Sequence, residues 1–406
     1  MTPAAISVEQ RRRRRARRHH QGSHRREGRD ARGGARALGP IHSTDPATPY
    51  LAIHARAEVS IDDVDAALYD EVSLRRFTTI RRTVFAMDAE VASAAFAAAN
   101  SPIVETLRRQ LIGWLDASDD VDGDAASFLA HVEAQVVAEL RSGGPRSGAQ
   151  LAEAIPDLAV RFEPKPGASY SRPQRITSKV LEILGTEMRI VRSRPTGADF
   201  TSGAWRWAAA DPRWLDEVAD VSPDAALVRL LVRYLDACAP ATVTDMTWFT
   251  GTTKTRVRRA LGELGAVEVE LAEADEPGFV LTDDPWLDGR EEPEPDSGAT
   301  VALVPGLDPT TMAWKQRAWY VDDSAGVGVF DRNGNAGPTI WVDGSVVGVW
   351  TQRSDGEMVM EILDGVDVPD DRRVQIEEEA ERIAGWLGDV RVNWRYPTPI
   401  TKRLES

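Results

Sequence analysis

The sequence PDAALVRLLVRYLDACAPATVTDMTWFTGTTKTRVRRALGELGAVEVELAEADEPGFVLTD, residues 223–283, passes from helical to strand-like periodicity. Apolar residues recur every three or four positions from Asp224 to Cys238, which predicts an amphipathic helix that ends before the following Ala-Pro pair. A shorter helix is expected from Thr244 to the turn at Gly251. The first half of this stretch is therefore expected to be helical.

The second half predicts a basic helix and a hairpin. Thr252 or Thr253 is placed to cap a helix with Val257 and Leu261 on its core face, and the runs VEVEL and GFVL then predict two paired strands. Helix, helix, turn, basic helix and hairpin is the order of a winged helix, a fold that can read the major groove of DNA. The polar faces of the third helix carry Lys254, Arg256, Arg258 and Arg259. These residues are either DNA contacts or a solvated helix face.

Composition limits the class of protein. The chain has 406 residues, a formal net charge of −15 and one cysteine, so two to four domains are expected. A lone cysteine excludes an internal disulfide framework and a cysteine-rich zinc site, and it suits a reducing compartment. No apolar run approaches the roughly 18 residues of a membrane span, and no signal peptide is evident. We therefore expect a cytoplasmic monomer without metal or cofactor, whose acidity still permits a local basic surface for double-stranded DNA.

The N-terminal segment, residues 1–36, differs in composition from the rest. Residues 11–36 hold twelve arginines and almost no apolar residue. Such a segment has no face to bury, so we expect it to be disordered. It is either a basic arm that contacts phosphates or a solvated tail.

Residues 37–120 are expected to form a first, incomplete winged-helix unit. A helix is predicted from Ala47 to Ala57, and Ser60 is placed to cap the next one. The run LRRFTTIRRTVFAMD alternates like a hairpin with arginines at its tip, and Arg81 and Arg82 there suit phosphate contacts. An alanine-rich helix should follow and bridge to the next unit.

Residues 121–215 repeat the winged-helix order more weakly. Helices are predicted at 128–140, 147–155 and 176–188, and a hairpin should follow them. Its strands carry Trp205 and Trp207, which are expected to belong to the core rather than to stack on bases. The predicted DNA contacts along this wing are Arg189, Arg192 and Arg194.

The complete prediction is an α+β fold with tandem winged-helix (helix-turn-helix) units. The third unit spans 216–284, and an acidic, proline-bearing linker covers 285–298. Residues 299–406 predict a β-barrel-like domain or a strongly bent sheet crossed by a helix, with a tight hairpin turn at Asp343-Gly344.

Several stretches together resemble one bacterial family, the winged-helix DNA glycosylases that include AlkZ and YcaQ. The matching stretches are GPIHSTDPATPYL (39–51), RRTVF (81–85), TDMTWFTGTTKTRVRRAL (244–261), GLDPTTMAWKQRAWY (306–320), FDRNGNAGPTIWVDGSVVGVW (330–350) and RYPTPI (395–400). The resemblance implies three tandem winged helices and a C-terminal β-barrel around a DNA channel. It also implies excision of alkylated bases, including those in interstrand crosslinks.

The resemblance also points to a site. The family's Gln-Φ-Gln or Gln-Φ-Asp signature falls on His42, Ser43 and Thr44, with Asp45 following, so neither glutamine is present. Asp45 could accept a proton from water and stabilise positive charge on the sugar, His42 could orient the water, and Thr44 could supply a hydrogen bond. Equally, Thr-Asp-Pro before a helix is a capping arrangement.

Two functions therefore remain open. The first is a DNA glycosylase for alkylated or crosslinked bases. The second is a tandem winged-helix DNA-binding protein without catalysis, regulatory or architectural, which the altered signature favours. The run DRNGN, residues 331–335, has alternating oxygen ligands but lacks the other features of a calcium loop, so a turn is expected there.

Overall fold

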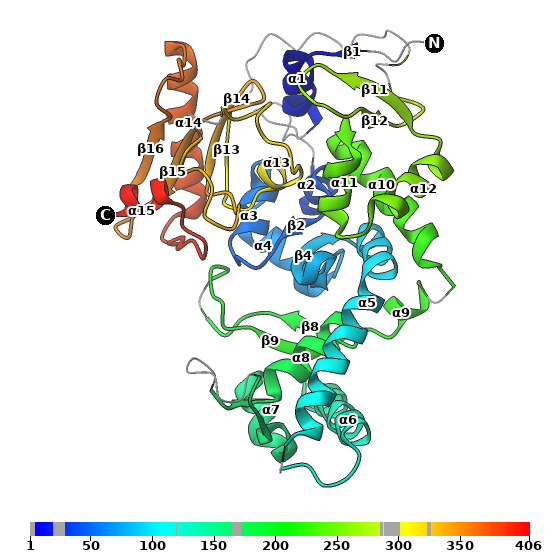
Figure 1. Ribbon diagram of the computed structural model, residues 1–406. Helices are drawn as coiled ribbons and strands as arrows, with labels where there is room; N and C mark the ends of the chain where they lie inside the picture. The colour runs from blue at the N-terminus through cyan, green and yellow to red at the C-terminus, as the bar shows by residue number, and fades with distance from the viewer. Residues whose placement is uncertain are drawn as a thin grey trace.

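The computed structural model describes residues 5–18, 29–118, 120–164, 172–197, 199–218, 220–284, 287, 301–322 and 326–406. The predicted α+β class is confirmed (Figure 1). Three times along the chain, a helix, a short strand, two further helices and a hairpin follow one another. In each case the short strand pairs antiparallel with the last strand of the hairpin, and in the third case residues Ala5–Ile6 add a fourth, parallel strand at the edge of the sheet.

The first of these units begins earlier than predicted, because the expected boundary at residue 37 falls inside its opening helix. Its elements are α2 (Ala31–Leu38), β2 (Ile41–His42), α3 (Thr48–His54), α4 (Ile61–Asp65) with a π-helical turn (Ala66–Asp70), β3 (Leu74–Thr79) and β4 (Thr83–Asp88). Ser60 caps α4 through a capping box. The predicted hairpin is confirmed, with Arg81 and Arg82 in the 3₁₀ turn at its tip.

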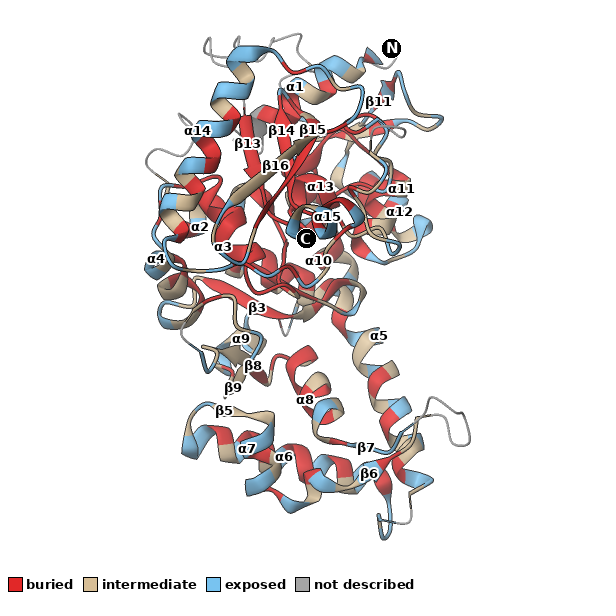
Figure 2. Cartoon of the chain, turned by 90° about the vertical axis from the view of Figure 1, so that its left-hand side faces the viewer, coloured by how far each residue is buried: buried red, intermediate tan, exposed pale blue. Residues whose placement is uncertain are grey.

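The second unit is carried on a long helix. The predicted alanine-rich bridge is α5 (Ala89–Asp116), which contacts α10 at one end and α6 and α8 at the other. The elements of the unit are α6 (Ala125–Gly143), β5 (Arg146–Ser147), α7 (Gly148–Ala154), a 3₁₀ turn (Pro156–Ala159), β6 (Arg161–Phe162), β7 (Gln174–Arg175), α8 (Thr177–Thr186), β8 (Ile190–Ser193) and β9 (Arg206–Ala209). This unit has a core of its own, which includes the far end of α5 (Figure 2).

The third unit follows the order read from residues 223–283. Its elements are α9 (Arg213–Asp216), α10 (Pro223–Cys238), β10 (Ala241–Thr242), α11 (Val243–Thr250), α12 (Lys254–Leu264), β11 (Val267–Leu271) and β12 (Gly278–Val280). Thr253 caps α12, and Thr242 rather than Thr244 caps α11. The reason is that Asp245 completes a capping box with Thr242.

The C-terminal domain has an open sheet rather than the predicted barrel. Its elements are β13 (Val301–Val304), α13 (Pro309–Met312), β14 (Thr339–Val342), β15 (Ser345–Gln352), β16 (Met358–Ile362), α14 (Asp370–Leu387) and α15 (Pro399–Glu405). Among the described residues, β13 and β16 form the two edges and do not pair. The segment 390–397 is irregular. Asp343 and Gly344 both have positive φ, as the predicted tight hairpin turn requires.

The prediction of a disordered N-terminal segment is wrong for most of the part that the structure describes. After β1 (Ala5–Ile6), α1 (Val8–Arg18) packs between the third unit and the C-terminal domain, and α2 opens the first unit (Figure 1). Residues 19–28 of that segment, and nearly all of the predicted linker 285–298, lie outside the described residues.

Ion pairs explain how an arginine-rich helix can be buried. Arg11 lies against Glu273, and Arg14 forms an ion pair with Asp284 in which both side chains are about 1% exposed. The guanidinium of Arg15 lies 3.9 Å from the ring centre of Trp314, and burial lowers the pKa of Arg15 to about 9. Composition alone misses this arrangement, because the compensating carboxylates and the aromatic ring come from residues 262 or more positions away.

A second buried ion pair joins the first unit to the C-terminal domain. Arg56, just after α3, donates two hydrogen bonds to Asp308, the N-cap of α13, at 2.7 and 2.9 Å, and neither side chain is exposed. The hydroxyl of Thr48 on α3 donates to the carbonyl of Gly306 at 2.7 Å. These bonds hold α3 against the loop that leads into α13.

We predict that Asp308→Asn lowers the free energy of unfolding by about 3–5 kcal/mol, because it leaves the Arg56 guanidinium buried without a counter-charge. Asparagine can still cap α13, so the variant removes the negative charge but keeps the helix cap. Urea unfolding followed by tryptophan fluorescence measures it. Arg13→Gln is the control: its ion pair with Glu9 is exposed, and we expect a loss below about 0.5 kcal/mol. Equal losses in the two variants would contradict the prediction.

Candidate active site between the first unit and the C-terminal domain

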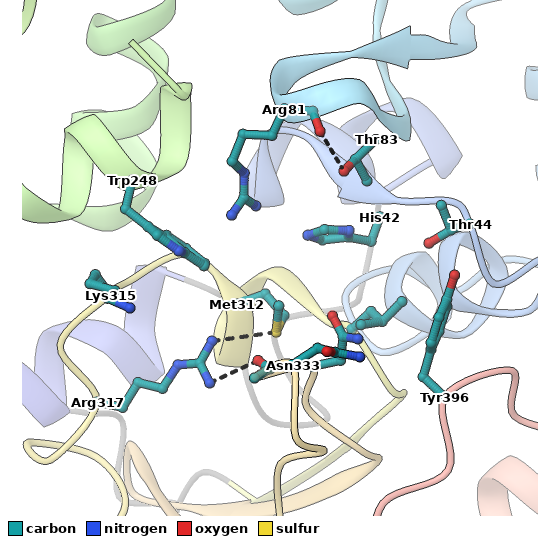
Figure 3. A pocket seen from close by; sticks show the side chains of 13 residues that line it. His42, Thr44, Arg81, Thr83, Trp248, Met312, Lys315, Arg317, Asn333 and Tyr396 are labelled. Atoms are coloured by element: carbon teal, nitrogen blue, oxygen red, sulfur yellow. Dashed lines mark hydrogen bonds between the residues drawn. The ribbon is translucent and has the colours of Figure 1, made fainter. Parts of the chain in front are cut away.

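A cavity of about 410 Å³ opens where the first unit, the third unit and the C-terminal domain meet (Figure 3). Its walls come from β2 and the β3–β4 turn, from α11, from the segment around α13, and from residues of the C-terminal segment. The lining residues are His42, Thr44, Arg81, Thr83, Trp248, Leu307, Met312, Lys315, Arg317, Asn333, Gly334, Asn335 and Tyr396. None of these described lining residues is Asp or Glu, so the cavity is strongly cationic.

His42 projects into this cavity from the end of β2. Its backbone pairs with Phe85 on β4, and its ring packs on the Phe85 ring at 4.6 Å. Among the described residues, no side chain or backbone group forms a hydrogen bond with the His42 imidazole. Burial, and then the positive charge of Arg81, lower the pKa of His42 to about 3. The imidazole is therefore neutral near pH 7, and a neutral imidazole offers one nitrogen as an acceptor.

Thr44 lines the cavity but Asp45 does not. The hydroxyl end of Tyr396 points towards Thr44 (Figure 3). One carboxylate oxygen of Asp45 accepts from the backbone N–H of Ala47 at 3.0 Å, and the other accepts from that of Arg395 at 2.9 Å. Burial raises the pKa of Asp45, although these two N–H donors oppose the shift. Asp45 therefore ties the start of α3 to the C-terminal segment.

Three cations surround Trp248 at the other end of the cavity. Arg81 has positive φ in the hairpin turn, and its guanidinium lies 4.2 Å from the ring centre of Trp248. Burial, and then the charge of Arg317, lower the pKa of Arg81. Arg317 donates to the carbonyl of Gly334 at 2.9 Å, and Lys315 is exposed. Among the described residues, none of these three cations forms an ion pair.

Of the nine predicted DNA contacts, five form ion pairs and four do not. Within the described parts of the chain, Arg81, Arg192, Lys254 and Arg258 have no carboxylate partner. The pairs are Arg82 with Glu182, Arg189 with Glu133 and Glu187, Arg194 with Asp65 and Asp70, and Arg256 and Arg259 with Asp224. Arg82 and Arg194 join the first and second units, a role that sequence spacing does not reveal.

Sequence reasoning missed most of the residues that line the cavity. Trp248, Lys315, Arg317 and Tyr396 are not marked by periodicity, although each lies in a stretch that carried the family resemblance. The run DRNGN forms the predicted turn, in which the Asp331 carboxylate accepts from the backbone N–H groups of Asn333 and Asn335 at 2.7 and 2.9 Å. His54 is packed, stacked on Trp386.

Comparisons with known proteins identify the family of this chain. Residues 35–386 match the protein family described as "DNA glycosylase AlkZ-like". The chain belongs to the AlkZ-like DNA glycosylase family. A solved structure, Streptomyces sahachiroi DNA glycosylase AlkZ, superposes with a TM-score of 0.67 at 18% identity, and the match covers 95% of this chain and 98% of that chain. At that identity the likeness shows the fold alone. No curated protein matches this chain.

Membership of the AlkZ-like family supports DNA as the partner. The position that the resemblance assigned to the family signature, His42 to Thr44, lies at the cavity. No metal-binding group of three His, Cys, Asp or Glu residues occurs in the described ranges. Within the same ranges, every helix is too short or too polar to cross a membrane.

We predict that His42 stays neutral from pH 8 to pH 5, because its pKa is lowered to about 3. NMR of the ring carbons in labelled protein would show no titration of His42 near pH 6.5, where a free imidazole titrates. In the unfolded chain the His42 imidazole binds a proton below about pH 6.5. In the folded chain it does so only near pH 3. The folded state therefore loses stability as the pH falls, by about 1.4 kcal/mol per unit.

His42→Gln is the control for this linkage. The unfolding free energy of the wild type minus that of the variant should decrease as the pH falls from 6 to 4, because only the wild type carries this imidazole. A His42 resonance that titrates near pH 6.5 would contradict the buried, neutral imidazole.

Proposed function

We propose that this protein is a monofunctional DNA glycosylase that hydrolyses the N-glycosidic bond of alkylated bases in duplex DNA. The observation that carries the proposal is the cationic cavity in which His42 and Thr44, at the position of the family signature, meet three unpaired cations. Excision of crosslinked bases is part of the same proposal and rests on the family resemblance.

The three cations suit the DNA backbone rather than the damaged base. An N7-alkylated purine is itself cationic, so Arg81, Lys315 and Arg317 would repel it in an empty cavity. Phosphate groups beside an extruded nucleotide would neutralise the three side chains. The negative charge of the phosphate groups would then stabilise the oxocarbenium character that develops on the sugar as the bond breaks.

His42 is proposed to hold the attacking water. As the carbon–nitrogen bond breaks, the electron pair leaves with the base and neutralises it, so no acid is required. The water oxygen then bonds to the anomeric carbon, and its proton passes to solvent water. A neutral imidazole can accept a hydrogen bond from that water, with Thr44 as a second polar contact. Because the low pKa of His42 makes it a weak base, we assign it orientation of the water before bond breaking.

The three repeated units are proposed to be winged helices that bind the duplex around this cavity. Each has the helix–strand–helix–helix–hairpin order, and Lys254 and Arg258 are exposed on α12 of the third unit. This is the proposed major-groove contact. Five of the other predicted arginines form the ion pairs described above: Arg82, Arg189, Arg194, Arg256 and Arg259.

A second function has one observation in its favour. Asp45, the carboxylate that follows the signature, accepts two backbone N–H groups and does not line the cavity. A site without a carboxylate fits a tandem winged-helix protein that binds DNA and performs no chemistry. The same experiment separates the two functions.

The test uses duplex DNA with one N7-alkylated guanine, followed by cleavage of abasic sites and detection of strand breaks under single-turnover conditions. We expect strand breaks with the wild type and a rate about 10² lower with His42→Ala, which removes the water-orienting imidazole without installing the glutamine of the family signature. Salt-sensitive DNA binding without breaks would leave the non-catalytic function. Breaks at an unchanged rate in His42→Ala would remove His42 from the mechanism.

Asp45→Asn tests the positioning role of this carboxylate. Asparagine has one oxygen where the carboxylate has two, so the N–H of Ala47 or of Arg395 loses its acceptor. We expect the free energy of unfolding to fall by about 1–3 kcal/mol, while the single-turnover rate at low temperature stays within about threefold of wild type. A loss of rate as large as that of His42→Ala, in folded protein, would instead give Asp45 a direct role in hydrolysis.

A further inference from the structure

A second group of cations meets at the junction of the first unit, the second unit and the C-terminal segment. Arg76 comes from β3, Arg192 from β8, and Arg395 from the segment between α14 and α15. Figure 1 shows the β8–β9 hairpin beneath the first unit, and β8 contacts β3. We call these three residues the junction arginines.

Trp205 lies between two of the junction arginines. The guanidinium of Arg76 lies 4.6 Å from its ring centre, and that of Arg192 lies 5.3 Å away. Arg395 extends along the loop of the same hairpin, because a side chain built at Gly203 would collide with its guanidinium. The ring and the loop therefore gather three positive charges that come from distant parts of the sequence.

These charges lack compensation among the described residues. Arg76 is 4% exposed; it donates to the hydroxyl of Tyr69 at 2.9 Å, and its Nε and Nη2 have no partner. Arg192 forms no hydrogen bond and no ion pair with a described residue. Burial, and then the charges of Arg76 and Arg395, lower the pKa of Arg192 to about 10.

The nearby carboxylates are already bound by other groups. Asp65 accepts from Tyr50 and Arg194, and Asp70 pairs with Arg194. Asp45 is close enough for the charge of Arg395 to affect it, but its two oxygens accept backbone N–H groups. Three converging guanidinium groups with unused donors repel one another, and a bound anion would relieve that repulsion.

We propose that the junction arginines bind one phosphodiester group of a DNA strand that leads to the cavity. Arg395 and Tyr396 are consecutive, and Tyr396 lines the cavity, so the two sites adjoin. Arg192 and the exposed Arg395 contact the phosphate, and the buried Arg76 strengthens the positive field from below. The phosphate also joins the second unit, which has its own core, to the rest of the molecule. The inference rests on the proposed DNA-binding function but does not require glycosylase activity.

The test is the salt dependence of duplex DNA binding by Arg192→Gln/Arg395→Gln. Losing one phosphate contact should lower the slope of log K against log salt concentration by about 0.9 and weaken binding roughly tenfold near 0.15 M salt. Arg395→Gln alone should show part of the effect. Its side chain is exposed and its backbone N–H bond to Asp45 remains, so the fold is kept.

Arg141→Gln/Lys402→Gln is the matched control, since it removes two exposed positive charges from the second unit and from α15. We expect the wild-type slope in this variant. A wild-type slope in the junction variant, or an equal loss in the control, would overturn the proposal. Failure of the wild type to bind DNA would overturn both this inference and the proposed function.

Two further outcomes separate the inference from the glycosylase proposal. Binding with the predicted loss of slope, but without strand breaks at an alkylated guanine, would support the junction site and reject the glycosylase. A thermal stabilisation by millimolar inorganic phosphate that the junction variant loses, together with an unchanged DNA slope, would assign the cluster to a small free anion. That result would overturn the phosphodiester proposal.

Discussion

Arg56 and Asp308 form a bidentate ion pair with neither side chain exposed, and the candidate active site depends on it. The pair fixes the end of α3 against the start of α13. His42 and Thr44 come from the chain just before α3, whereas Met312 ends α13, and Lys315 and Arg317 follow it. Together with the Thr48–Gly306 hydrogen bond, the pair helps to set the separation of the two walls of the cavity. A buried ion pair of this kind resists separation, because moving the two side chains apart would leave an unpaired charge in the protein interior.

The distribution of charge is the second constraint. A chain with a net charge of −15 still concentrates unpaired cations at two adjoining places, the cavity and the junction between units. Elsewhere, arginines such as Arg14, Arg75 and Arg194 are matched with carboxylates. Matched pairs hold the units together, and unmatched cations raise the local potential where an anionic polymer would bind. Net charge therefore says little about the partner of this protein, and local pairing says more.

Sequence reasoning predicted the features that depend on neighbouring residues and missed those that depend on contacts between distant segments. Helices and hairpins set by neighbouring residues, such as α10, α12 and the Asp343-Gly344 turn, were predictable from periodicity and turn chemistry. The burial of α1 was not, because Arg14 is compensated by Asp284, far along the chain. The same limit applies to the cavity. Resemblance identified His42 and Thr44, but Lys315 and Arg317 are brought to them only by packing between distant segments.

His42 and Asp45 lie three positions apart in the chain, and one has a proposed chemical role while the other has a structural role. Both are more than nine-tenths buried, yet Asp45 has both oxygens occupied by backbone donors, whereas His42 has no hydrogen bond with a described residue. A group that is fully bonded within the fold contributes rigidity, because moving it breaks those bonds. A buried polar group left without a partner lowers stability unless a ligand or water satisfies it. The Ser43 hydroxyl is also buried without a hydrogen-bond partner among the described residues, but it does not line the cavity. His42 is therefore the buried polar group that a substrate or water in the cavity would satisfy, and Asp45 is the group that ties the start of α3 to the C-terminal segment.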